Sequence, residues 1–297
     1  MTISELLTLA GSGILAGILA GFLGIGGGTV LVPMMLALGY EPINAVATST
    51  LSIMITSISG SIQNWRMGYL SLNRVIGIGF PALVTAQIGA YLANLFSDKI
   101  LLTSFGLLLL LNIYLVEVRK KVTKQKKKQE ENQNSSEFSS PPQNSTSLKL
   151  IPEILFPITP HPLSLVFEYQ QNSKPIQSQQ IARIITGSLA GLLAGIFGIG
   201  GGVIMVPLQI ILLNETIKTA IQTSLGVIVI TAFSACLGHA IQGNVIWVTG
   251  TILGLGGLLG AQFSTRFLPK LSEKTVSFAF KSLLFILSIY IFWKAFQ

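Results

Sequence analysis

The sequence predicts an all-α polytopic membrane protein with two homologous halves of four to five transmembrane segments each and with glycine-broken helices. Hydrophobic residues make up 50% of the 297 positions, charged residues make up 10%, and the mean hydropathy is +0.68. Several apolar runs approach the roughly 20 residues that a spanning helix needs, and none alternates like a strand of a membrane barrel. A glycine-rich motif also occurs twice, once in each half.

The repeated motif reads AGFLGIGGGTVLVP at residues 20–33 and AGIFGIGGGVIMVP at residues 194–207. Nine of the fourteen positions are identical at an offset of 174, and the same offset pairs Glu41 with Glu215. Self-similarity at a fixed offset indicates a duplication. Because the segment before the first motif has a counterpart deep inside the chain, we expect that segment in the mature protein.

Composition divides the chain into three parts. We expect a first transmembrane repeat at 1–118, a basic cytoplasmic linker at 119–180 and a second transmembrane repeat at 181–297. The linker is rich in Lys, Gln, Asn, Ser and Pro, and such a composition buries too little apolar surface to fold by itself, so we expect it to be largely disordered. Seven basic residues fall between Arg119 and Lys128, directly after an apolar run. The positive-inside rule favours a cytoplasmic flank here over a nucleic-acid site.

The basic cluster also sets the direction of the segments before it. Counting back, the helices at about 100–117, 75–95 and 43–63 start outside, inside and outside. If the second half ran parallel to the first, the basic loop at 266–274 would face outside, against the positive-inside rule. The charges therefore favour inverted halves of five segments each. The alternative is four full crossings per half in parallel halves, because the segment at 203–213 is short for a span.

The glycine runs interrupt segments that otherwise read as membrane helices. Irregular backbone at membrane depth is tolerated only where it is buried in protein or lines a cavity, and paired breaks in two repeats point to a transport site. Freed N–H groups at a helix N-terminus attract anions, and Pro33 and Pro207 suit the first turn of a fresh helix. The alternative is that the glycines only allow close helix packing. The expected anion-binding glycines are Gly26, Gly27, Gly28, Gly200, Gly201 and Gly202.

Polar side chains follow each glycine run, near the start of the next helix. At the offset of 174, one triplet matches the other, and hydroxyl and amide groups there would complete the coordination of an oxyanion, although such groups also hold membrane helices together. The triplets are Thr48, Ser49 and Thr50, and Gln222, Thr223 and Ser224. Weaker candidates for gating or coupling are Glu41, Glu215 and His239, because proton-coupled carriers use ionisable groups inside the bundle.

Several function classes lack support in the sequence. Cys236 is the single cysteine, so no intrachain disulfide is expected, and no His/Cys cluster predicts a metal or cofactor. The apolar segments carry no paired carboxylates and no nucleophile with an evident base, so we do not expect an enzyme. The expected partners are a small anion and the lipid bilayer, without nucleic acid, and a homo-oligomer is left open.

The residues that carry a family resemblance are the two motifs and the segments after them. GFLGIGGGTVLVPMMLALG followed by AVATSTLSI, and GIFGIGGGVIMVPLQIILL followed by AIQTSLGVI, resemble the sulfite exporter TauE/SafE family of membrane transporters. The resemblance covers about residues 5–118 and 181–295, and that family is usually drawn with two four-span halves.

The resemblance implies a multi-pass protein of the inner or plasma membrane that moves small sulfur-containing anions such as sulfite, thiosulfate or sulfoacetate. We therefore expect a secondary transporter, an exporter, that works by alternating access between the two halves. The alternative function is a membrane scaffold or assembly factor whose basic linker binds a partner.

Overall fold

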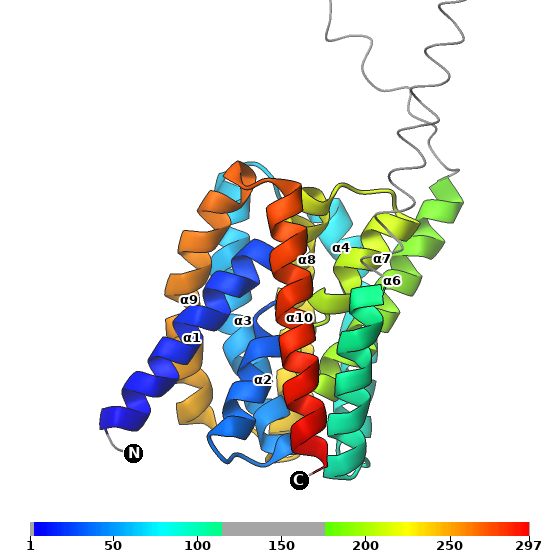
Figure 1. Ribbon diagram of the computed structural model, residues 1–297. Helices are drawn as coiled ribbons and strands as arrows, with labels where there is room; N and C mark the ends of the chain where they lie inside the picture. The colour runs from blue at the N-terminus through cyan, green and yellow to red at the C-terminus, as the bar shows by residue number, and fades with distance from the viewer. Residues whose placement is uncertain (1–2, 115–175, 297) are drawn as a thin grey trace, which may run out of the picture.

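The structure is a computed structural model that describes residues 3–114 and 176–296, and within these ranges the chain is helical (Figure 1). The first half contains α1 (Ile3–Leu23), α2 (Gly28–Ala37), α3 (Pro42–Arg66), α4 (Leu72–Ala93) and a helix at residues 98–114. The second half contains α6 (Ile176–Phe197), α7 (Gly202–Leu212), α8 (Ile217–Ile241), α9 (Trp247–Phe267), the 3-10 turn η2 (Leu268–Lys270) and α10 (Glu273–Ala295). The predicted all-α fold class is confirmed. The predicted linker lies outside the described residues except for its last five positions, which belong to α6.

A glycine break separates the first two helices of each half. Gly27 and Gly201 directly precede α2 and α7 in the left-handed region, with φ of 82° and 77°, a conformation that glycine adopts without the steric cost of a Cβ. Pro33 and Pro207 lie at the sixth position of α2 and α7. The expectation that they occupy the first turn was wrong, because each helix begins as soon as the chain leaves the last left-handed glycine.

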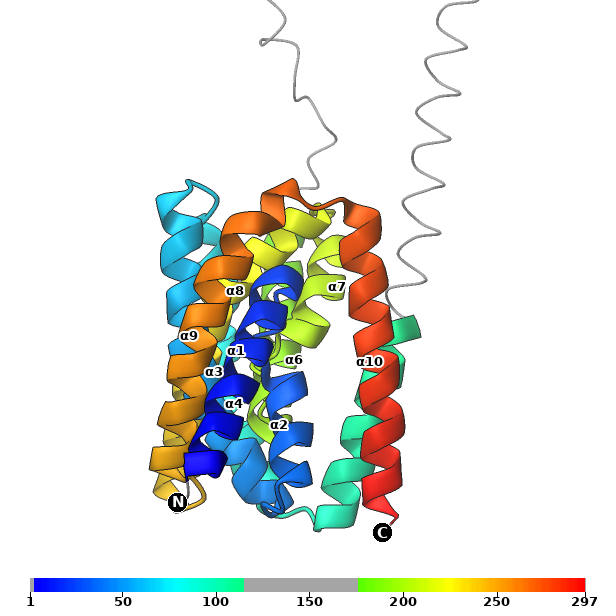
Figure 2. The same ribbon diagram turned by 60° about the vertical axis from the view of Figure 1, so that its left-hand side comes forward.

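The two halves run in opposite directions through the bundle. Figures 1 and 2 place both chain termini at one end, which we call the terminal end, whereas α6 begins at the opposite end. The ten residues of α2 span only about 15 Å, half of a bilayer core. Because α2 returns to the end where α1 began, α1 and α2 form a hairpin, and three crossing helices follow. The halves are therefore inverted, with five helices each, and the short helices do not restore a parallel arrangement.

The first helix of each half packs against a helix of the other half. α1 packs along α9 and α6 packs along α4, so the first helix of each half lies on the fourth helix of the other half, while α3 and α8 contact each other. Small residues allow this close packing, since a Cβ at Gly17 would collide with the backbone of Gly257, and a Cβ at Gly191 would collide with the carbonyl of Ala82. Such small-residue contacts are typical of membrane helices.

The outer surface of the bundle is apolar. Among the described residues, α1, α3, α4, α6 and α8 are long and apolar enough to cross a membrane. Large side chains such as Phe80, Phe263 and Phe285 are exposed on α4, α9 and α10. The helix at 98–114 packs beside α10, where Lys99 Nζ lies 5.5 Å from the ring centre of Phe296. An exposed apolar surface of this extent fits a lipid environment.

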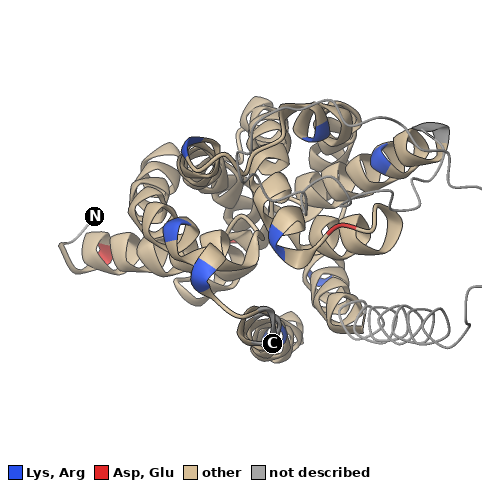
Figure 3. Cartoon of the chain, turned by 90° about the horizontal axis from the view of Figure 1, so that it is seen from above, with Lys and Arg blue, Asp and Glu red and all other residues tan. Residues whose placement is uncertain are grey.

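Charged residues distribute unevenly between the two ends. We call the end opposite the termini the basic end, and Figure 3 looks onto it. The basic residues at or near helix ends on this side are Arg66, Arg74, Arg183, Lys218, Arg266, Lys270 and Lys274, and the acidic residues there are Glu215 and Glu273. At the terminal end, acidic Glu5, Glu41 and Asp98 accompany basic Lys99 and Lys294.

Candidate functional site

The two glycine loops meet in the interior, between α3 and α8. A Cβ at Gly28 would lie 2.5 Å from the carbonyl oxygen of Gly198, and a Cβ at Gly202 would collide with the carbonyl oxygen of Gly24. Ile53 of α3 and Ile228 of α8 pack against both loops. The structure thus brings the six predicted anion-binding glycines together at one crossing, and all six are buried.

The crossing leaves backbone donors without a backbone acceptor among the described residues. In the first loop, the backbone hydrogen bonds of the described chain resume only at Val30, whose N–H donates to Gly27 O at 3.0 Å. In the second loop they resume at Met205, whose N–H donates to Gly201 O at 3.0 Å. The N–H groups of the six glycines have no acceptor among these bonds. α2 and α7 both begin here, so the positive ends of two helix dipoles lie close together, and such an arrangement binds anions.

Two serines hold the crossing together. Ser49 Oγ of α3 donates to Gly198 O at 2.6 Å and lies 2.7 Å from Val46 O. Ser224 Oγ of α8 donates to Gly24 O at 2.8 Å and lies 2.8 Å from Ile221 O. Each serine thus binds the glycine loop of the other half. A hydroxyl has one proton, and here carbonyl groups take it, so in this conformation the two serines position the loops.

One additional residue in α7 changes which residues of the two halves correspond after this helix. α7 has eleven residues and α2 has ten, and α3 and α8 correspond at an offset of 175. Ser49 therefore matches Ser224, as their hydrogen bonds show, and Glu41 matches Thr216, the N-cap of α8. The offset of 174 holds for the motif but fails after α7. The sequences AVATS and AIQTS already contained the better match.

The other predicted hydroxyl and amide groups bind the backbone or lie buried. Thr48 Oγ1 accepts a hydrogen bond from Ile246 N at 3.0 Å, and Thr50 Oγ1 donates to Ala47 O at 2.6 Å. Gln222 and Thr223 are buried in α8. Their role in binding stays a prediction.

Two buried hydroxyls that the sequence analysis missed lie in the first half. Thr29, in the first turn of α2, and Ser52, in α3, have no exposed surface, and their hydroxyl groups have no hydrogen-bond partner within the described chain. Val203 and Val227 occupy the corresponding positions of the second half. A hydroxyl directly after the glycine run was the available signal for Thr29. Thr29 can donate to a ligand at the crossing without giving up an existing bond.

His239 is wholly buried near the end of α8. Its Nε2 lies 2.9 Å from Gly195 O, and its Nδ1 has no partner among the described residues. At the offset of 175 its counterpart is Asn64 of α3, which is also wholly buried and whose two amide atoms have no partner there. Both side chains pack inside the bundle, away from solvent.

Glu41 and Glu215 lie in different environments. Glu41 is exposed at the terminal end, where its Oε2 accepts a hydrogen bond from Asn44 Nδ2 at 3.2 Å. The Glu215 side chain, between α7 and α8 at the basic end, is 11% exposed, and its Oε1 lies 3.6 Å from Arg74 Nε. Burial raises the pKa of Glu215, and the positive charges of Arg74 and Arg183 partly oppose that rise.

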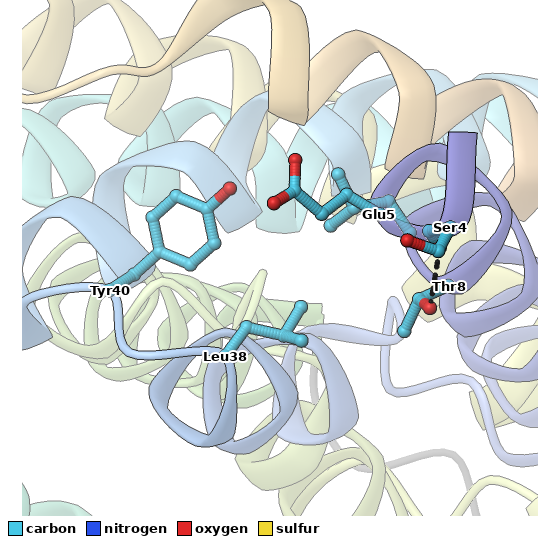
Figure 4. A pocket seen from close by; sticks show the side chains of 6 residues that line it. Ser4, Glu5, Thr8, Leu38 and Tyr40 are labelled. Atoms are coloured by element: carbon cyan, nitrogen blue, oxygen red, sulfur yellow. Dashed lines mark hydrogen bonds between the residues drawn. The ribbon is translucent and has the colours of Figure 1, made fainter. Parts of the chain in front are cut away.

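A pocket of about 280 Å³ opens at the terminal end, between the start of α1 and the turn after α2 (Figure 4). Its lining residues are Ser4, Glu5, Thr8, Leu9, Leu38 and Tyr40. The Glu5 carboxylate and the Tyr40 hydroxyl point toward each other across the space. Tyr40 Oη also lies 3.3 Å from Thr249 Oγ1 of α9. The pocket is therefore polar on the side of these two residues.

The family model described as Sulfite exporter TauE/SafE matches residues 9–291. The chain belongs to the TauE/SafE family. It is 24% identical over 277 residues to the probable membrane transporter protein YunE of Bacillus subtilis, with 89% of each chain covered. It is 24% identical over 268 residues to YdhB of the same organism, also a probable membrane transporter protein, covering 89% of this chain and 92% of the relative.

A further relative is a probable membrane transporter protein of Haemophilus influenzae, 35% identical over 98 residues, which cover 31% of this chain and 37% of the relative. No solved structure matches. The family, the similar proteins and the apolar helices identify this TauE/SafE protein as a multi-pass membrane transport protein. Among the residues described, no three His, Cys, Asp or Glu side chains lie together as metal ligands.

Proposed function

We propose that this TauE/SafE protein is a secondary transporter that exports a small sulfur-containing oxyanion of the sulfite, thiosulfate or sulfoacetate class. The observation that carries the proposal is the glycine crossing, where the N-termini of α2 and α7 meet and six glycine N–H groups have no acceptor among the described backbone bonds. Backbone donors and helix dipoles bind an anion without a charged side chain. Such a site holds its ligand without the tight ion pair that would slow release.

The distribution of charge supports the direction and the orientation. Under the positive-inside rule, the basic end and the linker after residue 118 lie on the cytoplasmic side of the cell or inner membrane. Basic residues outnumber acidic residues at this end and would concentrate anions there. Glu5, in the pocket at the terminal end, would disfavour their return.

The inverted halves support alternating access. In transporters with inverted repeats, the two halves exchange conformations around a fixed site near the membrane midplane. Here the glycine loops are buried from both ends, as expected for a state in which neither route is open. Opening on either side would separate the loops that Ser49 and Ser224 hold.

The first test is thermal unfolding of the purified full-length protein in detergent with sulfite, thiosulfate, sulfoacetate, sulfate or chloride. A ligand at about 100 times its Kd stabilises by roughly 2.7 kcal/mol. We expect a shift with at least one sulfur oxyanion and none with chloride, followed by uptake of that anion into liposomes containing the protein. A folded protein that neither shifts nor transports any of these anions would contradict the proposal.

Thr29→Val tests the location of the site. The change removes a hydroxyl that has no partner and introduces the residue type found at position 203, so the fold should persist. A hydrogen bond to a charged ligand contributes about 1.5–3 kcal/mol, so we expect anion affinity to fall about tenfold or more. Thr103→Val on the helix at 98–114 is the control, because the Thr103 hydroxyl makes only an exposed local bond, to Lys99 O. Equal affinity in both variants would place the anion elsewhere.

A further inference from the structure

Equivalent positions of the two halves form a pair at each end of the bundle. Tyr40 contacts Thr249 at the terminal end, with 3.3 Å between Oη and Oγ1. At the offset of 175 the same positions are Glu215 and Arg74, whose Oε1 and Nε lie 3.6 Å apart at the basic end. In both cases the turn after a short broken helix meets the first turn of a crossing helix. The duplication has produced one neutral pair and one charged pair.

A second guanidinium group flanks the charged pair. Arg183 of α6 packs over α4 at Gly77, where a Cβ would lie 3.4 Å from Arg183 Cδ and 3.6 Å from its Nη1. Gly77 is three residues after Arg74, so the two arginines occupy the same face of α4. Glu215 feels the charge of both. We call Arg74, Arg183 and Glu215 the Glu215 cluster.

The carboxylate of Glu215 forms no close hydrogen bond with the arginines of this cluster. The 3.6 Å separation from Arg74 exceeds hydrogen-bond distance, and Glu215 Oε2 is buried without a hydrogen-bond partner among the described residues. The Arg74 side chain is 41% exposed, so solutes can reach it. Lys218, three residues after Glu215 in the chain, donates to Pro269 O at 2.8 Å. Two arginines are thus available around a carboxylate that neither binds closely.

We propose that Arg74 and Arg183 form an oxyanion-binding site at the basic end and that Glu215 is its built-in anion, which an incoming oxyanion replaces. Guanidinium groups match the oxygens of small oxyanions in charge and geometry. The proposal rests on the proposed function in that the arriving anion is the transported one. It assigns Glu215 to a gate at one end rather than to the central crossing.

The position of Glu215 in the chain connects the gate to the crossing. Glu215 follows α7, and its N–H donates to Gln209 O at 3.3 Å. The turn is held by Asn214 in the left-handed region, with φ of 55°. α7 begins at the glycine crossing and ends beside Glu215, so an anion that displaces Glu215 also frees the outer end of α7. Through α7, anion binding at the basic end would then be coupled to rearrangement of the glycine crossing.

Sulfate binding to the full-length protein in detergent, measured by titration calorimetry at constant ionic strength, tests the proposal. Glu215→Gln removes the built-in anion while keeping the side-chain shape, and we expect sulfate affinity to rise about tenfold, which corresponds to about 1.4 kcal/mol. Adding Arg74→Gln or Arg183→Gln to that variant should abolish the gain. Asp98→Asn and Arg266→Gln are the matched charge controls, because both residues are exposed and lie outside the cluster.

Three outcomes would overturn the proposal: Glu215→Gln binds sulfate no better than Asp98→Asn, the gain survives removal of both arginines, or chloride binds with the same gain. Arg74→Lys keeps the charge and the fold but loses the fork of donors, so it should keep only part of the gain. Sulfite flux in liposomes separates this proposal from the proposed function. Wild-type flux with no effect of Glu215→Gln on affinity defeats only the gate, whereas tighter sulfate binding without any oxyanion flux defeats only the transport proposal.

Discussion

The two ends of the bundle use equivalent positions for different chemistry, whereas the glycine loops and the serines that bind them are alike in both halves. At the terminal end the uncharged residues Tyr40 and Thr249 contact each other, and Tyr40 lines an open pocket. At the basic end Glu215 lies beside Arg74 and feels the charge of Arg183. In the centre each half contributes one glycine loop and one serine that binds the loop of the other half. The duplication thus preserved the contacts that build the crossing and diversified those that face the solutions on either side.

The largest expected effect tests the symmetry of the centre. Gly28→Ala and Gly202→Ala each direct a Cβ into the backbone of the opposite loop, and overpacking of this kind costs about 1–3 kcal/mol or more. Both variants should lower the Tm in detergent by similar amounts. Gly11→Ala is the control, since nothing lies within 4 Å of a Cβ there. A large loss in one half alone would break the comparison.

A smaller effect is expected from the serines. Ser49→Ala and Ser224→Ala each leave a buried glycine carbonyl without its donor, which costs about 1–3 kcal/mol. We expect similar Tm decreases for both, and a double variant tests whether the two losses add. Ser104→Ala, which removes an exposed local bond to Ile100 O in the helix at 98–114, should change the Tm little. A Ser224 effect without a Ser49 effect would show that the loops are held unequally.

The pH dependence of stability sharpens the difference between the ends. Burial raises the pKa of Glu215 above its usual value near 4.5, so the folded state binds the proton more tightly than the unfolded state. The resulting stabilisation is complete below pH 4.5 and is lost as pH rises through the folded pKa. As pH rises from 4.5 through the folded-state pKa of Glu215, the Tm of the wild type should therefore fall relative to the Tm of Glu215→Gln. Parallel pH profiles for the two proteins would show that the Glu215 pKa is not raised.

The smallest effect is expected at the terminal end. Tyr40→Phe removes one neutral, partly buried contact of 3.3 Å, and such a bond contributes no more than about 1 kcal/mol. The Tm should change by a few degrees at most, with no dependence on pH between 4 and 8. A pH-dependent change would mean that this pair, too, includes a charge.

The sequence predicted the features that repeat and missed those that depend on spatial neighbours. Two identical glycine runs indicated broken helices, and basic residues in the loops indicated inversion, because both signals are local or compositional. The constant offset failed beyond α7, where one additional helical residue shifts the register and pairs Ser49 with Ser224. Arg74 and Glu215 are far apart in sequence, so no spacing predicts their contact.

The same limit applies to the central site. The glycine loops were identified from their residue type alone. That Ser49 donates to the loop of the other half, and that Thr29 has no partner, depends on how α2, α3 and α8 pack, which periodicity does not specify. Some hydroxyls predicted as ligands, such as that of Ser49, thus bind backbone carbonyls in this conformation, whereas the hydroxyl of Thr29 has no such bond.

Because the first helix of each half packs against the other half, assembly of the bundle depends on the order of synthesis. α1 packs along α9 through Gly13 and Gly17, whose neighbours Leu253 and Gly257 are synthesised more than two hundred residues later. A ribosome that has completed only the first half has produced a helix whose glycine-lined face has no protein against it. The glycine-lined face of α1 therefore stays in contact with lipid until α9 is inserted. If the first half were expressed alone, we expect this face to pack against a second polypeptide.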